Sequence, residues 1–175
     1  MNFKDMCSFN ISQLDPLDSE QGYNPDAQSA YLNRVSSIVP GMPGEVLLEW
    51  FQQNPGKAAT WAFLDLPALT WSPRLCTPAT LPGAEIMRGG ASQFQRLTKE
   101  APIFRRLVHM QVTRDLAWKN APILLETANL TFLSPPPEWL QTPLHLVEGY
   151  HRFVTLWSIR DQLDPGSPHR FWVGS

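Results

Sequence analysis

The sequence predicts an α+β fold, in which a helical N-terminal extension precedes a small mixed sheet with helices. Two patterns predict it: apolar residues recur at helical spacing before residue 120, and short apolar runs bounded by turn residues follow it. The composition agrees, because 43% of the 175 residues are apolar and only 17% are charged, which is typical of a chain that buries a core. We expect a flexible, polar arm over residues 1–27 and a single domain over residues 28–175.

Two short helices are predicted after the arm. Apolar residues recur at helical spacing over residues 28–38, and Pro40 ends that helix. A second helix begins near Pro43, places its apolar residues on one side, and stops at residues 54–56, Asn-Pro-Gly. The pair is predicted to form a helical hairpin.

The middle of the chain changes character. Residues 57–83 contain four prolines, a density that excludes a long helix and favours short extended pieces joined by turns. Helical spacing returns over residues 91–100 and again over residues 103–117, where Pro102 would lie in the first turn.

The C-terminal third has the clearest order of elements: strand, insert, strand, helix, strand. Strands are predicted over residues 121–126, 143–148 and 169–174, with an insert over residues 127–142 and a helix over residues 150–163. This order gives the expected sheet.

A single glycine separates the second of these strands from the helix. Gly149 allows a sharp turn and a close approach of backbone to a ligand, and the first helical turn exposes N–H groups that attract anions. Arg152 adds a planar cationic fork suited to phosphate oxygens. His151 can donate a hydrogen bond or transfer a proton near neutral pH, and Glu148 can accept a proton or orient a metal ion or a hydroxyl.

The same residues also have a purely structural interpretation. Gly149 can be an ordinary turn residue, and Arg152 can pair with Glu148 across one helical turn. The pattern alone leaves both interpretations open.

The tetrapeptide Gly149-Tyr150-His151-Arg152 resembles the Gly-x-x-Arg box of the ParB/sulfiredoxin-like superfamily. Residues 121–125 resemble the strand upstream of that box, and residues 171–173 resemble the closing strand. The resemblance covers residues 118–175, about a third of the chain, and implies the mixed-sheet core of that superfamily.

The resemblance further implies that the protein binds a nucleotide (ATP, ADP or CTP), with or without Mg²⁺. Phosphate binding would fall to Gly149, Tyr150 and Arg152, and catalysis of phosphoryl transfer or nucleotide hydrolysis to Glu148 and His151. Tyr150 stands where sulfiredoxins have their catalytic cysteine, so sulfiredoxin chemistry is not expected.

Two further candidates lie outside the box. Arg88 precedes two glycines and the helix expected from residue 91, which makes it a candidate second anion clamp. Ser92 can equally be the N-cap of that helix, with the glycines as a flexible turn. Trp139 is the best exposed candidate for stacking against a base.

Charge is unevenly distributed, although the net charge is only −2. Residues 1–85 contain four basic and nine acidic side chains, whereas residues 86–119 contain seven basic and two acidic ones. The basic segment predicts an alternative function, a non-catalytic module that binds nucleic acid or a protein partner.

Other classes of protein are not expected. No stretch of about 18 apolar residues could span a membrane, and the first residues lack the pattern of a signal peptide, so a cytoplasmic location is expected. Cys7 and Cys76 form no Cys-x-x-Cys motif and the four histidines are scattered, so neither a disulfide framework nor a metal site is predicted.

Overall fold

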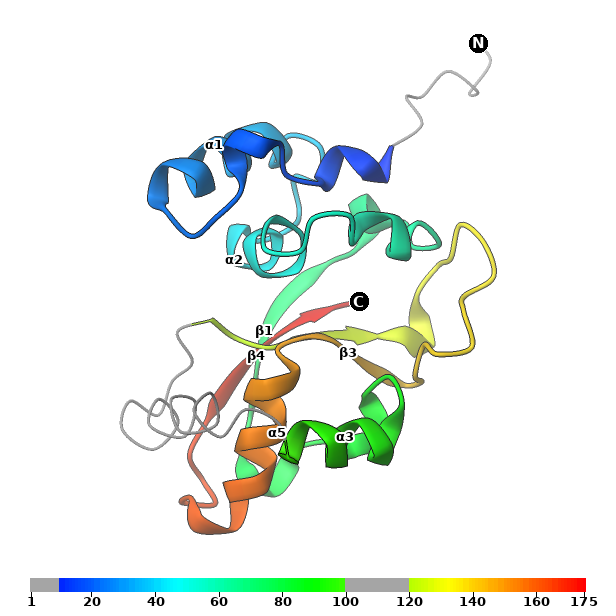
Figure 1. Cartoon of the computed structure of the whole chain (residues 1–175). Coiled ribbons are helices and arrows are strands. Elements are labelled where there is room, and N and C mark those ends of the chain that lie inside the picture. The colour runs from blue at the N-terminus through cyan, green and yellow to red at the C-terminus, as the bar shows by residue number, and fades with distance from the viewer. Residues whose placement is uncertain (1–9, 100–119) are drawn as a thin grey trace. The chain divides into compact units, whose positions relative to one another are not determined.

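The chain divides into two compact units (Figure 1). The first comprises Met1–Ala68 and Phe132–Pro135, and the second comprises Leu69–Thr131 and Pro136–Ser175. The structure is a computed structural model, and it describes residues 10–99 and 120–175. The boundary after Ala68 is not apparent from the sequence.

Two helices organise the first unit. α1 (Pro25–Val35) begins with proline at its first position, and the Asn24 side chain caps it by accepting a hydrogen bond from the Ala27 N–H (2.8 Å). α2 (Gly44–Leu47) continues into a π-helical turn over Leu48–Gln52. The two predicted helices are therefore confirmed, although the first starts earlier than expected and ends at Val35, so Pro40 does not terminate it.

Residues 10–27, the described part of the expected arm, are tied to α1. The buried Tyr31 hydroxyl donates to the Leu14 carbonyl (2.8 Å). Arg34 donates to both carboxylate oxygens of Glu20, at 2.8 and 2.6 Å. These side-chain hydrogen bonds hold the pKa of the Glu20 carboxyl below its ordinary value. Ordered contacts thus attach this segment to the helix.

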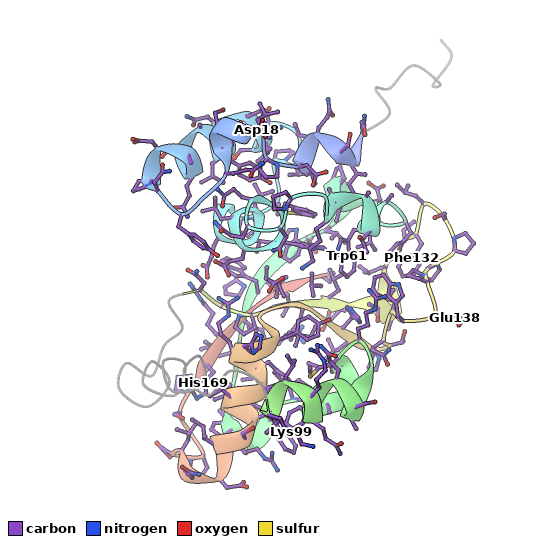
Figure 2. The ribbon with its side chains drawn as sticks, viewed as in Figure 1. Asp18, Trp61, Lys99, Phe132, Glu138 and His169 are labelled. Carbon is purple, nitrogen blue, oxygen red and sulfur yellow. The ribbon has the colours of Figure 1, made fainter. Side chains whose placement is uncertain are left out.

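An aromatic cluster fills the first unit. The Trp50 and Trp61 rings meet edge to face with centroids 5.0 Å apart, and Phe63 lies next to both Trp61 and Phe132. Figure 2 labels Trp61 and Phe132. The backbone of Phe132 also forms an antiparallel bridge with Leu64. These contacts explain why Phe132–Pro135 clusters with residues far earlier in the sequence.

The second unit contains a mixed four-stranded sheet in the order β1-β4-β2-β3. Its strands are β1 (Trp71–Cys76), β2 (Ile123–Glu126), β3 (Leu144–Glu148) and β4 (His169–Gly174). The central pair, β2 and β4, is parallel, and both edge strands pair antiparallel to their neighbours. The mixed sheet and its three C-terminal strands are as predicted, and β1 arises from the proline-rich segment.

Two helices cover one face of this sheet (Figure 1). α5 (Tyr150–Ile159) connects β3 to β4, and α3 (Gly90–Lys99) packs beside it. The core beneath them includes Leu97, Leu124, Leu146, Phe153, Leu156, Phe171 and Val173, whose removal from water stabilises the unit. The helix predicted over residues 103–117 lies outside the described residues. In the described part of the chain, no helix has the length and apolar character needed to cross a bilayer.

Candidate functional site

The junction between β3 and α5 has the glycine turn that the sequence predicts. Gly149 has a φ of +87°, and a Cβ on it would lie 2.9 Å from both Cα and Cβ of Pro122. Only glycine fits a left-handed conformation pressed against another backbone. The Gly149 N–H donates to the Glu148 carboxylate (2.9 Å), so this acidic side chain folds back over the turn.

Arg152 takes part in holding the same junction together. Its Nη1 donates to the carbonyl of Asn120 (3.0 Å), just before β2, and the side chain is partly buried. The neighbouring His151 is also half-buried. The arginine of the box therefore links α5 to the chain that enters β2.

A pocket of about 420 Å³ opens beside the first residue of α5. It is lined by Arg88, Gly89, Gln93 and Tyr150. The structure thus brings together Arg88 and Tyr150, two of the predicted phosphate-binding residues. The other predicted site residues, Glu148, Gly149, His151 and Arg152, are not among the residues that line it.

Arg88 lies over an aromatic ring. Its guanidinium carbon is 4.7 Å from the centroid of the Trp139 ring, within the range of a cation–π contact. Within residues 10–99 and 120–175, the guanidinium makes no hydrogen bond or ion pair with another side chain or carbonyl. The ring that was the best exposed candidate for stacking against a base is therefore in contact with Arg88, whose N–H groups are left for solvent or a ligand.

Tyr150 supplies a neutral hydroxyl at the pocket. Burial raises the pKa of its phenol to about 12, and a hydrogen bond from the Arg88 backbone opposes that rise only partly. The nearby Glu148 carboxylate raises the pKa further. At neutral pH the phenol is protonated and can donate a hydrogen bond to an anion.

His145 extends this cluster away from the pocket. Its ring centroid is 5.5 Å from that of Trp139, and its Nδ1 accepts a hydrogen bond from the Gln141 N–H (3.1 Å). Burial, aided by the charge of Arg88, lowers the pKa of His145 to about 4. The imidazole is therefore neutral near pH 7 and presents no second cation. The sequence placed His145 in a strand but carried no signal of this neighbourhood.

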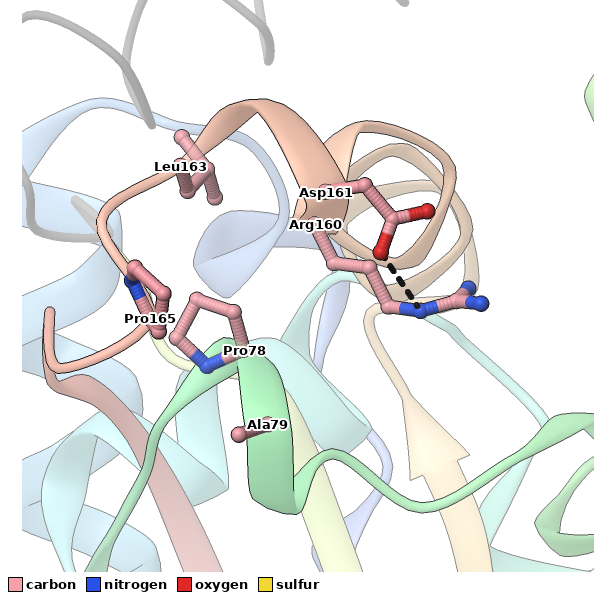
Figure 3. A pocket seen from close by; sticks show the side chains of 6 residues that line it. All are labelled: Pro78, Ala79, Arg160, Asp161, Leu163 and Pro165. Atoms are coloured by element: carbon pink, nitrogen blue, oxygen red, sulfur yellow. Dashed lines mark ion pairs between the residues drawn. The ribbon is translucent and has the colours of Figure 1, made fainter.

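A second pocket, of about 370 Å³, lies near the other end of α5 (Figure 3). It is lined by Pro78, Ala79, Arg160, Asp161, Leu163 and Pro165. Here the guanidinium carbon of Arg160 lies 3.5 Å from the centroid of the Trp157 ring. Its Nη1 donates to the Trp157 carbonyl (3.0 Å), and its Nε lies 3.7 Å from Oδ1 of Asp161. Arg160 thus already has a carbonyl and a carboxylate as partners, so this pocket suits an anion less well than the first.

Side chains that could bind a metal ion are not clustered in the described part of the chain. Between residues 10 and 99 and from 120 onward, no three His, Cys, Asp or Glu side chains are grouped so that they could hold a metal ion. Cys76 is a buried free thiol whose pKa is raised by burial, and Cys7 lies outside the described residues. Of the predicted basic segment, the described part holds Arg88, Arg96 and Lys99.

Comparison with known proteins identifies no relative. No family model matches the chain, no curated protein is similar to it, and no solved structure resembles its fold at a significant level. The similarity to the ParB/sulfiredoxin-like superfamily therefore stays a prediction.

Proposed function

We propose that this protein binds a nucleotide (ATP, ADP or CTP), with its phosphates in the pocket lined by Arg88, Gly89, Gln93 and Tyr150. The observation that carries the proposal is the guanidinium of Arg88, which is stacked on Trp139 with its N–H groups uncommitted to the described protein. A planar guanidinium in this state can bind two phosphate oxygens at once.

The surroundings of Arg88 favour an anion. Arg88 is separated only by Gly89 from α3, whose N-terminal end carries a partial positive charge. A cation at this end of a helix is electrostatically unfavourable, and an anionic ligand would relieve that repulsion while accepting hydrogen bonds from helix N–H groups. The protonated phenol of Tyr150 is a further donor. The volume of about 420 Å³ lies within the usual range of small-molecule sites, roughly 300–1,000 Å³.

The Gly-x-x-Arg box would act through its second residue. Tyr150 both lines the pocket and begins α5, so a phosphate bound there would approach the start of that helix. Arg152 would support the turn through Asn120 instead of facing the ligand. Phosphoryl transfer or nucleotide hydrolysis, with Glu148 and His151 as acid–base groups, is the reaction class that the resemblance favours; Mg²⁺ would be supplied with the nucleotide.

Calorimetric titration with ATP, ADP and CTP, with and without Mg²⁺, tests the proposal. Arg88→Ala should weaken binding about tenfold or more, the usual effect of losing a charge-assisted hydrogen bond. Arg160→Ala, which removes an arginine that also lies over a tryptophan ring, is the matched control and should bind normally. Unchanged binding by the Arg88→Ala variant would overturn the proposal, and an added Arg152→Ala variant shows whether the box arginine reaches the ligand.

The uneven charge favours a second candidate function, binding of nucleic acid through residues 86–119 without catalysis. Phosphate contacts by this segment would make the affinity fall steeply with salt. Duplex DNA binding that is salt-dependent, and lost when Arg105 and Arg106 are replaced by alanine, would support it. Those two arginines lie outside the described residues.

A further inference from the structure

We propose that Trp139, in the chain between β2 and β3, is a positioning residue for the proposed ligand: its ring holds the guanidinium of Arg88 at the pocket. This inference rests on the proposed function and adds to it a residue that does not line the pocket itself. It makes the segment predicted as an insert part of the binding site.

The Trp139 ring attracts the Arg88 guanidinium. The guanidinium carbon lies 4.7 Å from the ring centroid, a distance at which the face of the indole attracts the cation. Within residues 10–99 and 120–175 the guanidinium N–H groups make no hydrogen bond, and those are the groups that bind phosphate. The contact with the ring therefore holds the side chain while its donors remain available to a ligand.

Trp139 is held by contacts that do not involve Arg88. Trp139 is partly buried against His145, and its carbonyl accepts a hydrogen bond from the Gln141 side chain (2.9 Å). The Gln141 carbonyl in turn accepts one from the hydroxyl of the buried Thr127 (2.7 Å). These hydrogen bonds attach the end of the insert to Thr127, next to β2, and so hold Trp139 in place.

The contact with Trp139 also limits the rotamers that the Arg88 side chain can adopt. Its neighbour Met87 is fully buried, and Gly89 holds a left-handed turn with φ of +81°. The backbone is thus placed, while the long side chain is exposed and would sample many rotamers in solution. Contact with Trp139 restricts these rotamers in the free protein, so less freedom is lost when a ligand binds.

A double-mutant cycle on ATP affinity tests this role. Trp139→Leu removes the aromatic face and should weaken ATP binding about fivefold, the size of a typical cation–π contact, whereas Trp139→Phe should retain most of the affinity. In an Arg88→Ala background, Trp139→Leu should cause no further loss, because there is no guanidinium left to position. A merely structural role of Trp139 would weaken binding in both backgrounds.

Trp157→Leu, at the arginine–tryptophan contact near the end of α5, is the matched control and should leave the affinity for ATP unchanged. Thermal unfolding identifies any variant that fails to fold, and Trp139→Met, which also lacks an aromatic face, replaces Trp139→Leu in the cycle in that case. If Arg88→Ala loses binding but Trp139→Leu binds like the wild type, or if its loss persists in the Arg88→Ala background, the inference is overturned and the proposed function stands. If Arg88→Ala binds normally, the proposed function fails and this inference fails with it.

Discussion

In the second unit, Arg88, Arg160 and Arg170 each lie over a tryptophan ring, and the first two do so near opposite ends of α5. Near its start, Arg88 lies 4.7 Å from the ring centroid of Trp139, beside Tyr150. Near its end, Arg160 lies 3.5 Å from that of Trp157. Each of these two arginines lines a pocket of similar volume, about 420 and 370 Å³, so the pair of residue types does not by itself distinguish a ligand site from a structural contact.

The difference lies in what the guanidinium edge does. Arg160 donates to a carbonyl in the last turn of α5 and lies near Asp161 (Figure 3). A cation at the C-terminal end of a helix satisfies exposed carbonyls and the helix dipole, so Arg160 has a structural role. Arg88 stands at the N-terminal end of α3, where a cation opposes the dipole and no such role exists. The candidate site is therefore distinguished by guanidinium N–H groups that have no hydrogen-bond partner in the described residues, and not by the contact with a tryptophan ring.

The largest expected effect comes from breaking the start of α5. Gly149→Ala should lower the free energy of unfolding by about 3 kcal/mol, because alanine is strained at φ of +87° and its Cβ would lie 2.9 Å from the Pro122 backbone. Urea unfolding followed by circular dichroism measures it. Gly166→Ala, near the other end of α5, is the control: its Cβ would meet only the Asp164 side chain at 3.8 Å. Equal stability of the two variants would show that the close approach to Pro122 does not exist.

The pKa of His145 tests whether Arg88, and not Arg160, lies close to this imidazole. Arg88→Ala should raise the pKa of His145 above its value of about 4, because a nearby cation that disfavours protonation is removed, while burial keeps it below the ordinary 6.5. Proton NMR titration of the imidazole measures the change. Arg160→Ala should leave this pKa unaltered, and a His145 pKa that ignores Arg88 would contradict the cluster of Arg88, Trp139 and His145.

The same shift has a consequence for stability against pH. His145 has a lower pKa in the folded protein than in the unfolded chain, so the unfolded chain binds more protons between about pH 6.5 and pH 4. Its contribution to stability is therefore present above this window and is lost as the pH falls through it. Raising the folded pKa by Arg88→Ala narrows the window, so this loss should be smaller in the variant.

Much of the fold follows from local sequence signals. The apolar runs that became β2, β3 and β4 and the glycine at Gly149 are detectable because burial and a left-handed turn restrict the residue types. β1 was expected only as one of several short extended pieces, because Pro73 is compatible with an edge strand but is also typical of a turn.

The candidate site was predictable only in pieces. Arg88 and Tyr150 were both singled out, but nothing local in the sequence indicates that α3 and α5 place them at one pocket. The contacts of Arg152 and Trp139 could not be predicted from the sequence either. Arg152 was expected to face a phosphate, and its bond to the Asn120 carbonyl depends on how the chain enters β2. The stack of Arg88 on Trp139 likewise depends on tertiary packing between distant segments.

The smallest expected effect tests whether the second pocket can be made to resemble the first. Asp161→Asn removes an exposed carboxylate that lies 3.7 Å from Arg160, so stability should change by less than about 0.5 kcal/mol. Calorimetry with ATP should still give one site per chain, because Arg160 remains bonded to the Trp157 carbonyl and stacked on its ring. A second site appearing in this variant would show that local net charge, and not the commitment of the guanidinium edge, decides which stacked arginine binds an anion.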